Sequence, residues 1–531
     1  MVSAVSQTAP PAAGAVAAGA TRPARGAPRA AWALGAVLLV QAGLSVRLVW
    51  TGTADQGEAG YLWAGHLEWA HWVHAAPVPD LGAYLSGAPV AYPLVGALAG
   101  GAGGVGAARL LSLGLMLGVT VLLWATAARL YGRRAALLAC ALFATLAGTQ
   151  FLGSLATADA PALLLLALAT WLGVRGAGAG VAGGAGAGVG IVAGGVAAGR
   201  GPRVTLSRAA LLVGAGLVLA AADVTEYAAA LFTPVVIAVV ALAVWRRGGP
   251  RWSWLASSAI VLTAWAVPVA AAVVASGRDW PSVWAGALAY PAGDSAVGSV
   301  LRDAYVGTSL VLVLAVLGVW LSARSPRRGR FLPVVLLAAA LLVPAVQAGR
   351  HSTDGLANHV VFGAWFAAIA AGYALARLSR VDRGYGWAPV MALPIAAATL
   401  FGSMGGAHAL HRGWPDATAL VRVLRPAVQA HPGSYLADDE VPAYYLRSQV
   451  RWQNWSGTRS FRYAGQPAGA ASYAAAIARH HFALVIVDFG DTAAADAQIT
   501  ADLRRTSGYH VLARTGRFTV WADGGGRHAG H

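Results

Sequence analysis

Carboxylate and guanidinium side chains recur in the short segments that separate the long apolar runs of this chain. Asp55, Glu58 and Tyr61 follow the first run, and Asp159 stands where a later run begins. A positioned carboxylate can take the proton of an attacking hydroxyl, which typically accelerates a reaction about 10²–10⁴-fold. Arginine presents a planar fork of N–H donors that fits the oxygens of an anionic group. These residue types predict a site that handles a charged headgroup.

Further candidates lie in the other short segments, and they are Arg109, Arg302, Arg350, His351 and His359. Simpler interpretations stay open for several residues. Asp159 also fits the N-cap of the following helix, because aspartate just before an apolar run is a favoured cap. Arg109 and Arg302 also fit as anchors at the ends of membrane spans. His351 and His359 are eight residues apart, unlike the i, i+4 spacing of a helical metal pair, so the sequence supports a metal site only weakly and assigns no metal ligand.

The composition indicates a membrane protein with many spans. Of 531 residues, 57% are hydrophobic and 11% are charged, and the mean hydropathy is +0.60. Soluble domains carry about 25% charged residues, so a soluble enzyme of this size is excluded. A helix needs roughly 20 apolar residues to cross a bilayer. About eleven runs approach this length, near residues 30–50, 107–130, 135–153, 160–174, 209–223, 228–245, 254–275, 304–323, 331–348, 360–377 and 386–404.

The distribution of arginine predicts how these spans are oriented. The chain has 38 basic and 21 acidic residues, a net charge of +17, and no lysine. Arginines concentrate in alternate segments, within residues 129–134, 175–208, 246–251, 324–330 and 377–383. Positively charged segments stay in the cytoplasm, so the N-terminus is expected inside and, with an odd number of spans, the C-terminus outside. The basic charge thus encodes topology in the plasma membrane, and no nucleic-acid partner is expected. The single cysteine, Cys140, excludes a disulfide framework.

Composition also divides the chain into regions. Residues 1–28 read as a disordered cytoplasmic tail, residues 29–405 as the membrane domain, and residues 406–531 as a small extracytoplasmic α/β domain. Within the membrane domain, residues 51–106 form a long first outer loop with an amphipathic helix, and Gly/Ala-rich residues 176–202 form a flexible cytoplasmic linker. In the last region, strand-like pieces (SYLAD, FALVIVDF, HVLAR, FTVWAD) alternate with helical ones (ATALVRVLRPAVQA, ASYAAAIARHH, AADAQITADLRR).

Several segments, in this order, resemble the GT-C superfamily of polytopic membrane glycosyltransferases. They are QGEAGYLWAGHLEWAHW after the first run, AARLLSL, TADAPALLLLAL and LANHVVFGAWFAAIAAGYAL, with DDEVPAYYL and VIVDFGDT in the last region. The most similar group comprises protein O-mannosyltransferases and the lipid A aminoarabinose transferase, in an actinobacterial form. The resemblance covers most of the chain. It implies transfer of a sugar from a polyprenyl-phosphate carrier to an acceptor on the outer face, with inversion.

The resemblance also implies roles for the candidate residues. Glu58 or Asp55 is the expected general base, and Asp159 is expected to orient the acceptor or assist the base. Arginines are expected to hold the lipid phosphate, and the full set of expected substrate-binding residues is Tyr61, Arg109, Arg302, Arg350, His351 and His359. The acceptor is a glycan, a protein or a lipid, and the need for a divalent cation is left open. No nucleotide-binding glycine motif occurs, which agrees with a lipid donor.

Two positions depart from the pattern of this family. Gly57 stands where the family has an aspartate, and Asn358 stands where it has a lysine. One alternative is therefore a catalytically impaired paralogue that binds polyprenyl phosphate. Another is a lipid or solute transporter, although such proteins usually show internal repeats and polar residues at mid-membrane. The membrane glycosyltransferase remains the leading hypothesis.

Overall fold

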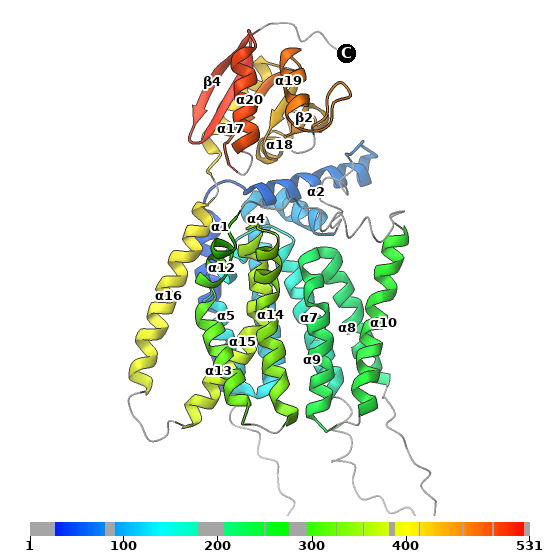
Figure 1. Cartoon of the computed structure of the whole chain (residues 1–531), viewed down its shortest axis with the longest axis vertical. Helices are drawn as coiled ribbons and strands as arrows, with labels where there is room; N and C mark the ends of the chain where they lie inside the picture. Colours follow the sequence, from blue (N-terminus) through cyan, green and yellow to red (C-terminus); the bar gives the residue numbers. More distant parts are fainter. Residues whose placement is uncertain are drawn as a thin grey trace, which may run out of the picture.

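The computed structural model describes residues 27–79, 91–178, 206–248, 251–275, 295–324, 327–353, 355–381, 388–413, 415–458, 461–490 and 493–524. Residues 1–26 of the predicted tail (1–28) and residues 179–202 of the predicted linker (176–202) lie outside these residues, whereas residues 27–28 and 176–178 are helical. A bundle of long helices carries a small α/β domain at one end (Figure 1). We call this end of the bundle the domain end.

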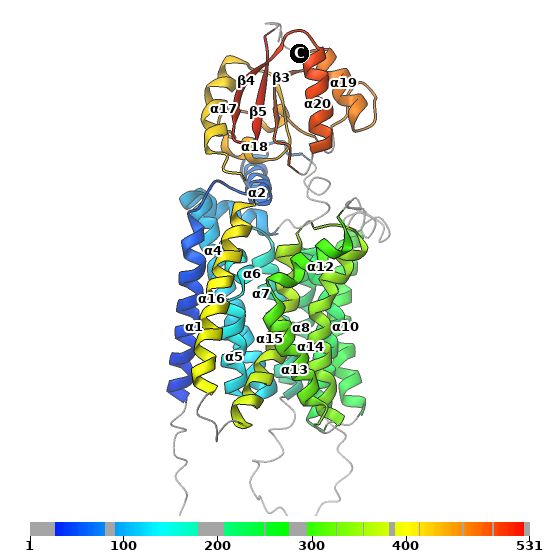
Figure 2. The same ribbon diagram turned by 60° about the vertical axis from the view of Figure 1, so that its left-hand side comes forward.

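The bundle is built from helices that coincide with the predicted apolar runs. Its members are α1 (Ala27–Val49), α4 (Ala91–Tyr131), α5 (Arg133–Ala144), α6 (Ala147–Leu152), α7 (Asp159–Gly178), α8 (Leu206–Thr225), the short 3-10 helix η1 (Tyr227–Phe232), α9 (Thr233–Arg246), α10 (Arg251–Ala275), α12 (Val297–Val306), α13 (Ser309–Ser322), α14 (Arg327–Gly349), α15 (Leu356–Val381) and α16 (Ala388–Arg412). Figure 2 shows α1 and α16 side by side at one edge. The predicted helical multi-span architecture with a C-terminal α/β domain is confirmed.

Among the described residues, eight helices are long and apolar enough to cross a membrane, or nine if bent α12 and α13 form one span. The number eleven predicted from the runs is not established by these helices, since α5 and α6 are individually short. Helix α15 is central in the bundle. In its most apolar stretch 83% of the residues are buried, compared with 11% in that of α10. Stacked rings of Phe232, Phe362 and Phe366 pack in this core. The apolar composition therefore builds both the membrane-facing surface and the interior.

A helix outside the bundle, α2 (Gln56–His74), lies across the domain end, between the bundle and the α/β domain (Figure 1). It packs closely on α4, because a Cβ at Gly65 would lie only 1.9 Å from the carbonyl oxygen of Pro93. Helix α4 itself bends at Gly103 and Gly104, and Gly104 has a φ of 68°. Glycine allows both features, since it has no Cβ and tolerates positive φ. The start of α4 can therefore lie against α2 before the chain turns into the bundle.

The α/β domain contains one five-stranded sheet in the order β2-β1-β3-β5-β4. Its elements are α17 (Thr418–Ala430), β1 (Ser434–Ala437), α18 (Val441–Tyr445), η2 (Trp452–Asn454), β2 (Trp455–Gly457), α19 (Ala470–Ala478), β3 (Phe482–Val487), α20 (Ala493–Arg505), β4 (Tyr509–Thr515) and β5 (Phe518–Asp523). β1 runs parallel to both β2 and β3, and β5 runs antiparallel to β3 and β4. Every residue of β3 is buried, as expected for a central strand covered on both faces.

The α/β domain shares one hydrophobic cluster with α2 and with the bundle, to which the bundle contributes Ala108 of α4. Leu62 and Trp63 of α2 belong to the same buried cluster as Leu420 and Tyr444 of the α/β domain. The backbone N–H of Ala54 also donates to the Tyr445 hydroxyl at 2.8 Å. The domain is thereby fixed directly above the segment that connects α1 with α2.

Candidate active site

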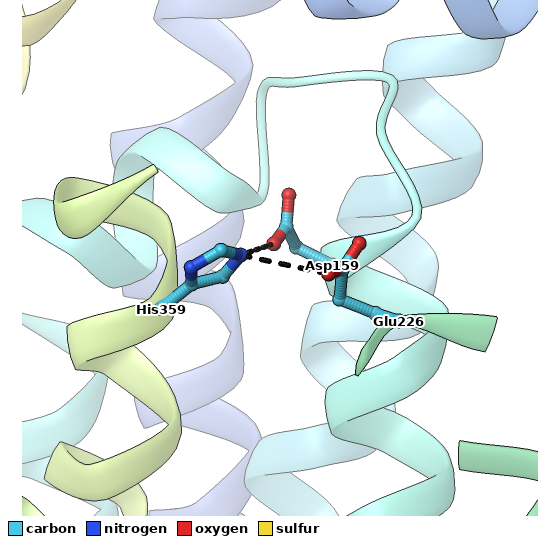
Figure 3. A group of neighbouring side chains, drawn as sticks. All are labelled: Asp159, Glu226 and His359. Carbon is cyan, nitrogen blue, oxygen red and sulfur yellow. Dashed lines mark ion pairs between the residues drawn. The ribbon is translucent and has the colours of Figure 1, made fainter. Parts of the chain in front are cut away.

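Three titratable side chains from three separate segments meet at the domain end (Figure 3). Asp159 begins α7, Glu226 lies between α8 and η1, and His359 is in the first turn of α15. The Nε2 atom of His359 lies 3.4 Å from Asp159 Oδ1 and 3.8 Å from Glu226 Oε1. The side chains of Asp159, Glu226 and His359 are 6%, 17% and 22% exposed. The three side chains are therefore mostly buried, but part of their surface is still accessible.

Neighbouring residues fix the orientation of both carboxylates. The Thr157 hydroxyl donates to Asp159 Oδ2 at 2.7 Å, and Asn358 Nδ2 donates to the same oxygen at 3.1 Å. The Tyr61 side chain of α2 hydrogen bonds to Glu226, which also accepts weakly from the backbone N–H of Ala228 at 3.4 Å as the N-cap of η1. Asp159 Oδ1 faces His359 at more than the usual hydrogen-bond length of about 2.7–3.2 Å. A substrate hydroxyl could take that place.

This arrangement of two carboxylates around an imidazole supports two kinds of chemistry. It can accept a proton from a hydroxyl, with His359 and the second carboxylate stabilising the charge that moves. It also offers one nitrogen and two oxygen ligands within 4.8 Å of one another, which is a set that divalent cations accept. Asp159 and Asn358 are 199 positions apart, so the sequence alone could not pair them.

Glu58 and Arg109 form a closed ion pair beside this group. Their charged atoms approach to 2.6 Å, and their side chains are 0% and 1% exposed. The remaining Arg109 N–H groups donate to the carbonyl oxygens of Val49, Thr51 and Thr53. Glu58 also accepts from the backbone N–H groups of Asp55 and Ala156. In this structure both side chains are engaged with each other, and the pair holds α2 to α4 and to the segment before Asp159, so the roles of Glu58 as base and of Arg109 as phosphate ligand stay predictions.

Asp55 is the N-cap of α2 and forms a capping box with Glu58. Its side chain lines a cavity of about 250 Å³ between the bundle and the α/β domain, together with Asp439 and Arg517. Burial and the nearby charge of Glu58 raise the pKa of Asp55 to about 6. Thr157, which donates to Asp159, lies 3.9 Å from the Cβ position of Gly57, the residue two positions after Asp55.

The remaining predicted residues lie on α12 and at the end of α14. Arg302 is 71% exposed and pairs with Asp303, and Arg350 is partly buried next to exposed His351. The backbone N–H of Ser295 donates to His351 O at 2.9 Å, which ties the start of α12 to the end of α14. These residues share the domain end with Asp159 but lie on α12 and just after α14.

Sequence reasoning did not select Glu226 or Asn358 as site members. The only signal for Glu226 was an acidic residue followed by tyrosine between two apolar runs. Asn358 was noted because it departs from the family pattern, and the structure shows that its amide contacts Asp159.

The fold matches solved membrane glycosyltransferases. ArnT from Cupriavidus metallidurans, solved with undecaprenyl phosphate, aligns with a TM-score of 0.56 and 17% identity over 93% of this chain and 98% of that one. The oligosaccharyltransferase AglB from Archaeoglobus fulgidus, solved with an inhibitory peptide and a dolichol-phosphate, aligns with a TM-score of 0.55 and 13% identity over 93% of this chain and 74% of that one. No protein-family model matches the sequence, and no curated protein matches it significantly.

The architecture is therefore a GT-C-like fold, as the sequence predicts. At these identities the similarity concerns the fold. The resemblance of ArnT extends over nearly its whole length, so the α/β domain is included in the match.

Proposed function

We propose that this protein transfers a sugar from a polyprenyl-phosphate donor to an acceptor hydroxyl, with Asp159, Glu226 and His359 at the reacting centre. The observation that carries the proposal is their convergence at the domain end of a GT-C-like bundle. ArnT was solved with undecaprenyl phosphate and AglB with a dolichol-phosphate, which supports a lipid-phosphate donor. The acceptor is a glycan, a protein or a lipid.

Asp159 is the proposed general base. Thr157 and Asn358 hold its Oδ2, so its Oδ1 points in a defined direction toward His359. As Oδ1 takes the acceptor proton, the acceptor oxygen forms a bond to the anomeric carbon while the bond from that carbon to the lipid phosphate breaks on the opposite face. The configuration is thus inverted, and the lipid phosphate leaves with the electron pair.

The leaving phosphate gains negative charge, which cations stabilise in the transition state. Arg350 and Arg302 are proposed to provide this charge, and His351 a hydrogen bond to the phosphate, because they lie at the domain end on α12 and just after α14 and, unlike Arg109, are not buried in the protein interior. The arginine-rich segments lie at the helix ends opposite the α/β domain. By the positive-inside rule we propose that those ends face the cytoplasm and that the domain end lies outside the plasma membrane.

The test is donor profiling with the purified full-length protein. Radiolabelled sugars on undecaprenyl phosphate are offered with a cell-envelope extract as acceptor, and incorporated label is counted. Asp159→Asn keeps the acceptor oxygen for Thr157 but removes the base, so incorporation should fall about 10²-fold or more. The exposed Asp416→Asn serves as the control and should match the wild type. Failure of all donors, or equal label in both variants, would remove the proposal.

A second candidate function, an impaired paralogue that binds polyprenyl phosphate, is favoured by Gly57. A Cβ at this position would lie 3.3 Å from Asp55 Oδ1 and 3.9 Å from Thr157, so an aspartate there could reach toward the Asp159 segment. If the paralogue interpretation holds, Gly57→Asp should raise sugar transfer strongly above a near-zero wild-type level. No gain in Gly57→Asp, with measurable wild-type transfer, favours the active enzyme.

A further inference from the structure

The α/β domain contains another cluster of buried carboxylates. Asp438 follows β1, Asp488 follows β3, and Asp496 is in the first turn of α20. The three residues are 9%, 6% and 0% exposed. One carboxylate oxygen of each lies within 4.8 Å of the other two. Such proximity is unfavourable for three ionised groups unless a positive charge lies between them.

The position of the cluster in the sheet is one at which ligands commonly bind. β1 and β3 are parallel neighbours in the sheet, and the chain leaves them in opposite directions, from β1 toward β2 and from β3 toward β5 and β4. Such a reversal opens a crevice beyond the carboxyl ends of the two strands, where α/β sheets bind their ligands. Asp438 and Asp488 are the first residues beyond those two ends.

Three consecutive backbone N–H groups hold the carboxylates in place. Those of Asp488, Phe489 and Gly490 donate to Asp438 Oδ2, Asp496 Oδ2 and Asp488 Oδ1 at 2.8, 2.8 and 2.7 Å. On the far side, Arg517 pairs with Asp488 Oδ2. Among the described residues, Arg517 is thus the cation that pairs with this cluster of three carboxyl groups.

A separate observation concerns the second oxygen of Asp438. Asp438 Oδ1 is buried, and among the described residues no N–H or hydroxyl group donates to it, while the neighbouring carboxyl of Asp496 lies within hydrogen-bond reach of Asp438. A buried polar atom without a partner loses its hydration without compensation, at a cost of about 1–3 kcal/mol or more when charged. Because the neighbouring Asp496 is another acceptor, only a cation or a proton can satisfy this oxygen.

We propose that Asp438, Asp488 and Asp496 bind a hard divalent cation, Ca²⁺ or Mg²⁺. All the ligand atoms are carboxylate oxygens, which these two cations prefer, whereas the softer transition metals favour nitrogen or sulfur. The cation fixes the end of β1 to the end of β3 and to α20. This site is independent of the proposed glycosyl transfer, since its residues belong to the α/β domain alone.

The test is calorimetric titration of the full-length protein in detergent, after removal of metal with EDTA, with CaCl₂ and in a separate experiment with MgCl₂. One of the two cations should bind at this site and raise the melting temperature, because a ligand that binds only the folded state stabilises it. Asp438→Asn and Asp496→Asn should each weaken binding about tenfold or more. Asp438→Asn keeps an acceptor for the Asp488 N–H and relieves repulsion, so its melting temperature in EDTA should equal or exceed that of the wild type.

Two further variants separate this site from other carboxylates. Asp502→Asn alters another buried aspartate of α20, one that pairs with Arg505 outside the cluster, and should bind the cation like the wild type. Asp159→Asn removes a ligand of the other potential cation site and should also leave this binding event unchanged. The proposal is overturned if neither cation binds at millimolar concentration, which would leave a shared proton as the occupant. Equal binding by Asp438→Asn, Asp496→Asn and Asp502→Asn would overturn it as well.

Discussion

At the scale of single residues, the Glu58–Arg109 pair illustrates how burial changes the role of a charged group. Every Glu58 oxygen and the Arg109 guanidinium are engaged inside the protein. Removal of one partner from a buried pair leaves the other charge without compensation, which costs about 3–5 kcal/mol. Glu58→Gln should therefore lower the free energy of unfolding by several kcal/mol, measured by chemical denaturation in detergent.

The exposed Arg302–Asp303 pair provides the control for this prediction. Exposed ion pairs contribute about 0–1 kcal/mol, so Asp303→Asn should change stability little. A stability loss in Glu58→Gln no larger than in Asp303→Asn would show that the buried pair does not hold α2 in place.

The residue types of the candidate site could be predicted, but their partners could not. Asp159 and Glu58 lie at the same end of the bundle, as the alternation of spans requires, and Glu58 accepts from Ala156 three residues before Asp159. The choice of Arg109 as the partner of Glu58, 51 residues away, follows from how α2 crosses α4. The spacing of residues along the sequence does not indicate where α2 crosses α4. The sequence therefore could not show that Glu58 and Arg109 form a buried ion pair.

At the scale of elements, α2 carries two carboxylates whose protonation changes with folding. Burial raises the pKa of Asp55 to about 6 and that of Glu68 to about 7, from ordinary values of 3.8 and 4.5. Between about pH 4 and pH 7 the folded state thus holds protons that the unfolded chain has released. Stability should therefore fall as the pH rises through this window, and it should be highest at its acid end.

The double variant Asp55→Asn/Glu68→Gln tests this dependence. Asparagine is also a good N-cap, so α2 should persist. The melting temperature of the wild type should fall more steeply from pH 4.5 to pH 7.5 than that of the double variant, while Asp416→Asn should keep the wild-type slope. Parallel slopes in all three proteins would contradict the assignment.

Helices and strands could be predicted where the pattern of apolar residues along the sequence is clear. Long apolar runs gave the bundle helices, and alternating or continuous apolar pieces gave β1, β3, β4 and β5. β2 has only three residues, Trp455–Gly457, and is defined by its pairing with β1. Three residues are too few for an alternating apolar pattern, so the sequence could not predict this strand. The bend of α4 at Gly103 and Gly104 was likewise hidden within a glycine-rich run.

At the scale of the whole molecule, the α/β domain, α2 and the domain end of the bundle form a continuous structure. The shared hydrophobic cluster joins them, and the cavity that Asp55 lines lies between them. Composition could predict the two regions but not their contact, because docking depends on which side chains meet in space. The orientation of the domain end relative to the cell remains a prediction from arginine distribution.

The most direct test of the proposed reaction compares Glu226→Gln with Glu58→Gln in single-turnover sugar transfer from undecaprenyl phosphate, per mole of folded protein. Glu226 faces the reacting centre, whereas Glu58 is sealed against Arg109. Glu226→Gln should slow transfer about 10²-fold while its melting temperature stays near that of the wild type, and folded Glu58→Gln should retain most of the rate. An unchanged rate in Glu226→Gln, together with loss of transfer in well-folded Glu58→Gln, would contradict this account and return catalysis to Glu58.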